Sequence, residues 1–336
     1  MNRKLRTGAL LGALVIAATA VPASAQSPSA PAASDITIYG MYKRMDQGWF
    51  QNEAKGAEDA GAALGIKVVT LDNQFDPNVM SANLDNAIAE KASGIIMVVP
   101  DQQLGAGVID KAKAAGIPLI AVDASIKDAD GNPAPFVGMN TTQIGTDVGT
   151  MLAGFATDRG WFDATDPNSL KVAALTFSTL DVCNQRTDAS KAAILAGVPG
   201  LSPDAIIAQD YAGANTDGGL QAMQGLLTTN PDVKHWLVYS CNEEGVVGAV
   251  RALEAVGKDA DSCGVGLGDG ALAKIEMIEK KSPGYCGSLY VDSRKHGAVA
   301  VQELYDFVTA GTPIPMESLQ DGTKVTADNA AAVFGN

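Results

Sequence analysis

Polar side chains able to hydrogen-bond a small ligand recur where predicted strands end. The apolar run at 36–39 is followed by Lys43, Asp46 and Gln47, and Trp49 stands where the next predicted helix begins. Similar candidates near later strand ends are Asp123, Arg186, Asn242 and Asp269. In an open parallel sheet, the carboxyl ends of the strands form the edge at which ligands bind. We therefore expect these side chains to share one binding site.

This set of side chains suits a polyhydroxylated ligand. Each hydroxyl both donates and accepts hydrogen bonds, so carboxylates, amides and an arginine satisfy it. An aromatic ring such as that of Trp49 covers the C–H face of such a ligand. A glycosidase would use two carboxylates across a cleft, and Asp123 with Asp269 is the pair available. Binding without catalysis is the simpler account.

The predicted elements that carry these residues alternate between strands and helices. The first unit is a strand from Ile36, a helix from Trp49 to Leu64 ended by Gly65, and a strand at 66–72. Short apolar runs, each followed by a helix, indicate a parallel sheet buried on both faces. The alternation restarts at Lys171, after the loop 161–169, and predicts two similar lobes of an α/β protein. The tail 314–336 offers a short strand at 323–326 and little else.

The N-terminus predicts export. Arg3, Lys4 and Arg6 precede an apolar run at 9–20 and the small-residue stretch 21–25, which together indicate a signal peptide at 1–25. Residues 26–34 read as a flexible Pro/Ala/Ser linker. No cysteine stands at the cleavage point, so we expect no lipid anchor there. The protein is expected in the periplasm or outside the cytoplasmic membrane.

Composition excludes several classes of function. The chain has 336 residues, of which 46% are hydrophobic, enough for two lobes of ordinary size. A net charge of -14 argues against nucleic acid and anionic membrane surfaces as partners. GxSxG and P-loop motifs are missing, and the GVGLGDG stretch at 264–270 lacks one glycine of a dinucleotide fingerprint. We expect a non-enzyme without a cofactor.

The cysteines predict disulfides. An exported protein with four cysteines allows three pairings. We favour Cys183 with Cys241 and Cys263 with Cys286, a hypothesis that depends on which strands are neighbours. With only two histidines and no CxxC motif, the sequence shows no pattern of metal ligands.

Several stretches together carry a family resemblance. They are KRMDQGWFQNEAKGAEDAG, VVPDQQLGAGVIDKAKAAGIPLIAVD, LDVCNQRTDAS, PDVKHWLVYSCNEEGVVGAVRALEAVG and GYCGSLYVDSRKHG. In these stretches the chain resembles the periplasmic arabinose-binding proteins of bacterial ABC sugar importers, from about residue 35 to 336. The resemblance implies the type I periplasmic binding protein fold, in which two Rossmann-like lobes joined by a three-segment hinge close on a sugar. The lobes would comprise 35–141 with 293–320, and 142–292 with 321–336.

The resemblance also assigns roles to individual residues. It implies that Lys43, Asp123 and Arg186 bind the sugar and that Trp49 stacks on it. Asn242 takes the place of the family's asparagine, and Asp269 that of a further polar ligand, although a one-residue gap lets Gly268 compete. The apolar contacts would be Phe50, Met139 and Leu180.

Departures from the family bear on which sugar is bound. Ala124 replaces a second aspartate, Gln47 beside Asp46 replaces a glutamate, and Cys241 replaces a methionine. L-arabinose is the leading ligand, with galactose, fucose, xylose and glucose still open. The expected partners are this sugar and a membrane permease, with the protein acting as a monomer. The rival functions are a sugar sensor for a chemoreceptor or sensor kinase, and a secreted glycoside-processing enzyme.

Overall fold

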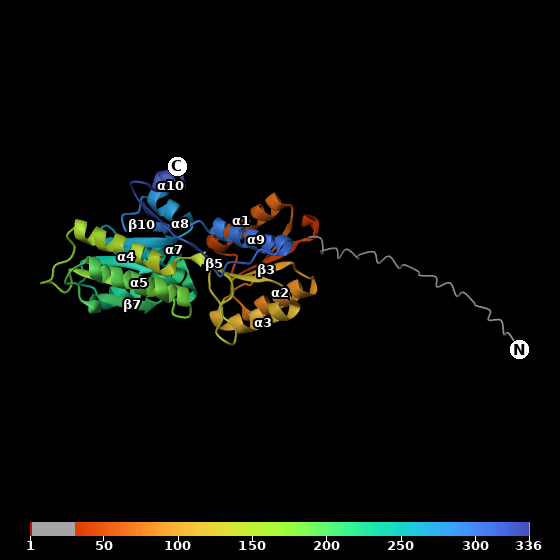
Figure 1. Cartoon of the computed structure of the whole chain (residues 1–336). Coiled ribbons are helices and arrows are strands. Elements are labelled where there is room, and N and C mark those ends of the chain that lie inside the picture. Colours follow the sequence, from red (N-terminus) through yellow and green to blue (C-terminus); the bar gives the residue numbers. More distant parts are fainter. Residues whose placement is uncertain (2–30, 336) are drawn as a thin grey trace. The chain divides into compact units, whose positions relative to one another are not determined.

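Two six-stranded sheets organise the protein, each with the strand order of a doubly wound fold (Figure 1). The structure is a computed structural model that describes Met1 and residues 31–335. Apart from Met1, the predicted signal peptide and the first part of the predicted linker lie outside the described residues. The linker's last two residues, Ala33 and Ser34, belong to a short 3₁₀ helix at Ala33–Asp35. The described residues from Pro31 onward form one compact unit.

The first sheet has the order β11-β5-β4-β3-β1-β2, and all of its neighbouring strands are parallel. Its strands are β1 (Thr37–Tyr42), β2 (Lys67–Asp72), β3 (Gly94–Met97), β4 (Leu119–Val122), β5 (Phe136–Met139) and β11 (Glu317–Gln320). The helices that cover it are α1 (Gly48–Leu64), α2 (Pro77–Ala89), α3 (Gly105–Ala115) and α9 (Ser293–Ala310), with a 3₁₀ turn at Gln102–Leu104.

The second sheet repeats this order as β12-β10-β9-β8-β6-β7, with only β12 antiparallel to its neighbour. Its strands are β6 (Leu170–Thr176), β7 (Ile206–Asp210), β8 (His235–Ser240), β9 (Ser262–Gly268), β10 (Tyr285–Tyr290) and β12 (Thr323–Thr326). Its helices are α4 (Thr141–Asp158), α5 (Asp181–Gly197), α6 (Thr216–Thr229), α7 (Glu243–Ala255), α8 (Ala271–Lys274) and α10 (Ala330–Phe334), with 3₁₀ turns at Pro203–Ala205 and Ala212–Ala214.

The chain passes between the two sheets three times, after β5, after β10 and after β11. This arrangement confirms the predicted α/β class with two Rossmann-like lobes and a three-segment connection. Two details differ from the prediction. The tail holds β11 and α10 as well as the expected strand, and the helix predicted from 271 to 281 becomes α8 followed by a π-helical turn at Ile275–Glu279.

Helices cover both faces of each sheet. Successive side chains along a strand point to opposite faces, so a central strand packs against helices on both. In β3, Ile95 and Met97 join the core under α2 and α3, while Ile96 packs on the other face under α1 and α9. The second sheet is covered in the same way by α4 and α5 on one face and by α6 and α7 on the other. The near-continuous apolar strands of the sequence are explained by this double coverage.

Helices α1 and α9 are far apart in the sequence and lie side by side (Figure 1). Glycines allow this close approach. A Cβ on Gly56 would lie 1.9 Å from the carbonyl oxygen of Arg294, and a Cβ on Gly297 would lie 2.0 Å from that of Glu53. The contact therefore brings Glu53 of α1 against the first turns of α9.

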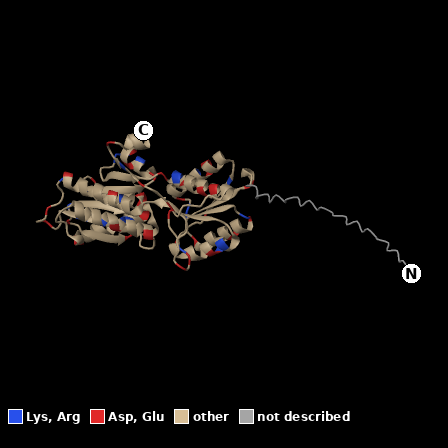
Figure 2. Ribbon diagram, viewed as in Figure 1, with Lys and Arg blue, Asp and Glu red and all other residues tan. Residues whose placement is uncertain are grey.

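Within the described residues, none of the helices combines the length and the apolar character needed to cross a membrane. Charged residues are scattered along many helices and loops of both lobes (Figure 2).

Candidate functional site

A cavity of about 490 Å³ lies at the carboxyl ends of strands from both sheets. Its walls come from the segments after β1 and β4 of the first sheet and after β6, β8 and β9 of the second. Both sheets reverse their strand order beside β1 and β6, which is where a doubly wound sheet leaves a crevice for a ligand. The lining includes every residue that the sequence analysis selected as a ligand contact: Lys43, Asp46, Gln47, Trp49, Phe50, Asp123, Met139, Leu180, Arg186, Asn242 and Asp269.

Lys43 and Asp123 are the principal charged groups from the first sheet. Lys43 follows β1, and its ammonium lies 5.1 Å from the ring centre of Phe50. Asp123 follows β4 with φ 69, a left-handed conformation that is rare outside glycine. Its backbone N–H donates to the carbonyl of Val137 at 3.0 Å, which holds this conformation. Strained residues of this kind cluster at ligand sites.

Arg186 and Asn242 come from the second sheet. Arg186 lies on α5 and is only 7% exposed, and its Nη1 donates to the Cys241 carbonyl at 2.9 Å. Its Nε has no partner among the described residues and remains a free donor. Asn242 caps α7, and its Oδ1 accepts from Gly245 N.

Opposite charges balance each other across this cavity. Burial lowers the pKa of Lys43, and the carboxylate of Asp123 is the main opposing influence. Burial also lowers the pKa of Arg186, again opposed first by Asp123. One carboxylate from the first sheet therefore faces cationic groups from both sheets, an arrangement that favours a neutral polar ligand over an ion.

Three of the selected residues already bond to other protein groups. Asp46 forms a bidentate pair with Arg44, which lowers the pKa of that carboxyl. Gln47 Nε2 donates to the Ala214 carbonyl at 3.2 Å and so joins the two lobes. Asp269 Oδ2 accepts from Asn52 Nδ2 at 2.6 Å, another contact between lobes. These side chains line the cavity, but part of their hydrogen-bonding capacity is already used.

The apolar part of the wall is well buried. Phe50, Met139 and Leu180 are between 2% and 5% exposed. Trp49 is partly buried and packs against the cores of both lobes. Its ring meets the His296 ring edge to face, with centroids 5.5 Å apart.

A buried polar cluster behind the cavity was missed by the sequence analysis. Glu53 on α1 and His296 on α9 are 0% and 1% exposed, and Glu53 Oε1 lies 3.4 Å from His296 Nδ1. Burial raises the pKa of Glu53 well above its usual range, with Asp123 adding to the effect. Burial lowers the pKa of His296 to about 4. A proton on Glu53 and a neutral imidazole therefore avoid an isolated buried charge.

Glu53, Asp123 and His296 offer ligand atoms within 4.8 Å of one another, the spacing of a cation site. The cations Lys43 and Arg186 act on the same Asp123 carboxylate. A metal ion would add a further positive charge beside these two, so this cluster is better suited to supporting Trp49 and Asp123 than to holding a metal.

Two acidic residues of α7 were also missed. Glu243 and Glu244 line the cavity directly after Asn242. Burial raises the pKa of Glu243 to about 8, with Asp269 and Glu244 adding to the effect. Burial also raises the pKa of Glu244 to about 7. Both follow the end of β8, as Asn242 does, so the strand-end rule points to them too, but Glu244 can equally be interpreted as a residue that favours the N-terminal dipole of α7.

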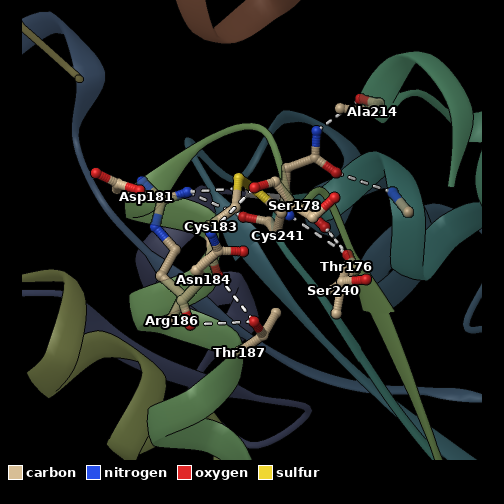
Figure 3. The surroundings of a disulfide bond; sticks show 12 residues. Thr176, Ser178, Asp181, Cys183, Asn184, Arg186, Thr187, Ala214, Ser240 and Cys241 are labelled. Atoms are coloured by element: carbon tan, nitrogen blue, oxygen red, sulfur yellow. Dashed lines mark hydrogen bonds between the residues drawn. A yellow bond between two sulfur atoms is a disulfide. The ribbon is translucent and has the colours of Figure 1, made fainter. Parts of the chain in front are cut away.

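The cysteines form two disulfides, Cys183 with Cys241 and Cys263 with Cys286, which are the pairs that the sequence analysis favoured. The first joins the start of α5 to the segment between β8 and α7, beside Arg186 (Figure 3). The second joins the neighbouring strands β9 and β10.

Known proteins resemble this chain over nearly its whole length. The family model for the periplasmic binding protein domain matches residues 38–312. An ABC transporter L-arabinose-binding periplasmic protein of Azospirillum brasilense is 32% identical, over 99% of this chain and 98% of that protein. The L-arabinose-binding periplasmic protein of Escherichia coli is 31% identical, over 88% and 89%.

Solved structures agree with this relationship at the level of the fold. A periplasmic solute-binding protein of an ABC transporter from Actinobacillus succinogenes, with bound D-allose, matches with a TM-score of 0.76. The match covers 88% of this chain and 99% of that one at 22% identity. The family model and the two relatives carry the assignment: the chain belongs to the periplasmic binding protein family.

Proposed function

We propose that this protein captures a monosaccharide between its two lobes and delivers it to an ABC importer in the membrane. The observation that carries the proposal is one cavity that is lined both by Lys43, Trp49 and Asp123 of one lobe and by Arg186 and Asn242 of the other. The names of the two L-arabinose-binding relatives support the same ligand class.

The chemistry of the cavity suits sugar hydroxyls. Asp123 supplies acceptors, whereas Lys43 and Arg186 supply charged donors, so a hydroxyl between them both donates and accepts. Trp49 with the apolar wall covers the C–H face of the ring. Charge-assisted hydrogen bonds are stronger than neutral ones, above all where water is excluded. A ligand that forms such bonds with both lobes at once is therefore favoured.

Binding would shift an equilibrium between open and closed forms, because only the closed form lets both lobes hydrogen-bond the sugar. We assign 35–141 with 293–320 to one lobe and 142–292 with 321–336 to the other, with hinges at the three crossings. The two separate sheets support this division, and the Gln47 to Ala214 hydrogen bond is then a contact between the proposed lobes.

L-arabinose is the first candidate ligand. The resemblance implies two carboxylates near the sugar at positions where this chain has Gln47 and Ala124. The side chain of Gln47 donates instead to the Ala214 carbonyl of the other lobe. Losing a charged partner changes the free energy of one hydroxyl contact by about 1.5–3 kcal/mol, enough to alter the preferred sugar. Galactose, fucose, xylose and glucose therefore belong in the test.

We further infer export by the segment 1–25, action as a monomer in the periplasm or another extracytoplasmic space, and a role without catalysis. For the enzymatic rival, Asp123 and Asp269 would have to act as the acid and the base. The Asp269 carboxylate already accepts hydrogen bonds from Asn52 and from Ala271 N, which favours a structural role.

A ligand panel with the mature protein tests the proposal. Thermal unfolding is recorded with each of the five sugars, and we expect at least one sugar to raise the melting temperature in a concentration-dependent way. Incubation with aryl arabinosides and galactosides provides the second arm. Released sugar would favour the secreted enzyme, and no stabilisation by any sugar would contradict the proposal.

A further inference from the structure

The disulfide between Cys183 and Cys241 forms part of the cavity wall. Both cysteines line the cavity, and they are only 1% and 5% exposed. Cys183 lies in the first turn of α5, and Cys241 lies between β8 and α7. The bond thus ties together two segments that each present a candidate ligand group.

The first of these groups is Arg186, one turn after Cys183 on α5. Its Nη1 donates to the carbonyl oxygen of Cys241 at 2.9 Å and lies 3.9 Å from the Cys241 sulfur (Figure 3). The guanidinium of Arg186 therefore hydrogen-bonds to Cys241, the residue to which the disulfide links helix α5. The remaining N–H groups, including the unpartnered Nε, are held in one orientation as a result.

The second group is Asn242, the residue after Cys241. Its Oδ1 accepts from the Tyr211 hydroxyl at 2.7 Å and from Gly245 N at 3.1 Å, and its Nδ2 donates to the Ala214 carbonyl at 2.8 Å. These bonds use both acceptor positions and one of two donors, so a single N–H remains for a ligand. A shift of residue 241 would redirect that N–H.

The other disulfide makes a different connection. Cys263 and Cys286 tie β9 to β10, two strands that already pair through their backbones. Both cysteines are buried in the lobe's core, and neither is among the residues that line the cavity. The Cys263–Cys286 disulfide can therefore serve as a control, because it lies in the same lobe and its cysteines do not line the cavity.

We propose that the Cys183–Cys241 disulfide is a positioning element of the ligand site, which fixes Arg186 and Asn242 relative to each other before the ligand binds. The proposal rests on the proposed sugar-binding function. Pre-set donors lose less freedom when a ligand arrives, so the tether contributes to affinity and not only to stability.

The test compares Cys183→Ala/Cys241→Ala with Cys263→Ala/Cys286→Ala, using L-arabinose as the probe in calorimetric titrations. Both double variants should melt at lower temperature than the wild type, because each loses a cross-link that restricts the unfolded chain. Only the first should bind more weakly, with Kd raised about tenfold, the equivalent of about 1.4 kcal/mol. The titrations are made well below both melting temperatures.

A second variant separates the covalent tie from the bulk of the sulfur atoms. Cys183→Ala/Cys241→Met refills the wall with a flexible apolar side chain but leaves α5 untied. We expect its affinity to stay about tenfold below that of the wild type. Recovery of wild-type affinity would show that packing alone matters and would overturn the proposal. This variant also decides the question if the double alanine variant fails to fold.

A thermodynamic cycle with Arg186→Lys gives a third readout. If the tether acts through Arg186, the substitution should cost less affinity in the untied protein than in the wild type. Additive losses would contradict positioning. Equal affinity of the two double alanine variants would also refute the inference while leaving sugar binding intact. Absence of binding by the wild type to any of the five sugars would instead refute the proposed function.

Discussion

Asn52 Nδ2 donates a hydrogen bond to Asp269 Oδ2 at 2.6 Å, and this contact joins α1 of the first lobe to the loop after β9 of the second. The other oxygen of Asp269 accepts from Ala271 N at 3.2 Å. Asp269 was predicted as a ligand contact, and both of its oxygens already have protein partners. Its carboxylate thus serves as a contact between lobes at the edge of the cavity.

Asn52→Ala should weaken ligand binding about tenfold, because the closed form loses one charge-assisted hydrogen bond worth about 1.5 kcal/mol. Calorimetric titration with L-arabinose measures the change in Kd. Asn86→Ala is the control, since Asn86 is an exposed residue of α2. Equal affinity of Asn52→Ala and the wild type would show that this contact has no part in closure.

Lys43→Met should raise Kd by about 10- to 100-fold. The substitution removes a charged donor, and it leaves the Asp123 carboxylate with one fewer of the two cations, Lys43 and Arg186, that act on it. Lys55→Met, on the exposed face of α1, removes a lysine that pairs with Asp59 and should leave Kd unchanged. Comparable affinities for the two variants would exclude Lys43 from the site.

Gly297→Ala should destabilise the protein by about 1–3 kcal/mol, because the added Cβ would lie 2.0 Å from the backbone oxygen of Glu53. Gly107→Ala is the matched change in α3, where a Cβ meets no atom within 4 Å. That variant should be more stable by about 0.5–1 kcal/mol, since alanine favours helix. Urea unfolding measures both, and a neutral Gly297→Ala would mean that α1 and α9 tolerate a wider separation.

The sequence was sufficient to locate the cavity but not the bonds within it. Charged and polar residues after apolar runs identified Lys43, Asp123, Arg186 and Asn242, because the parallel-sheet rule depends only on strand order. It could not identify Glu53 as buried, since that burial arises where the glycines of α1 meet α9 some 240 residues later in the chain. The pairing of Asp46 with Arg44 likewise depends on side-chain directions that no spacing encodes.

The tail shows a second limit. Strand β11 has the sequence ESLQ, in which only Leu319 is apolar, and Leu319 is itself 49% exposed. An edge strand with one sheet neighbour needs little hydrophobicity, so periodicity gives almost no signal for it. Its place beside β5 is set by the three crossings of the chain, which only the whole fold specifies.

Glu243 should make stability fall as the pH rises. Burial raises the pKa of its carboxyl to about 8, so the folded protein holds a proton there that the unfolded chain releases above pH 4.5. The contribution is fully present below pH 4.5 and is lost on the way to pH 8, at up to about 1.4 kcal/mol per pH unit.

Glu243→Gln mimics the protonated acid, and its amide can still bond Ser288 and Leu272 N. Unfolding free energies from urea titrations at pH 5 and pH 8 should therefore differ less in this variant than in the wild type. Glu90→Gln, an exposed change at the end of α2, should retain the wild-type difference. An unchanged pH dependence in Glu243→Gln would mean that Glu243 is ionised in the folded protein.

Capture of a monosaccharide between the two lobes is tested most directly by isothermal titration calorimetry of the mature wild-type protein with L-arabinose. We predict saturable binding with one sugar per chain, and either weaker or no binding for galactose, fucose, xylose and glucose. Tighter binding of one of those four sugars would identify that sugar as the ligand and leave the proposed mechanism unchanged. No heat and no saturation with any of the five sugars would contradict the account.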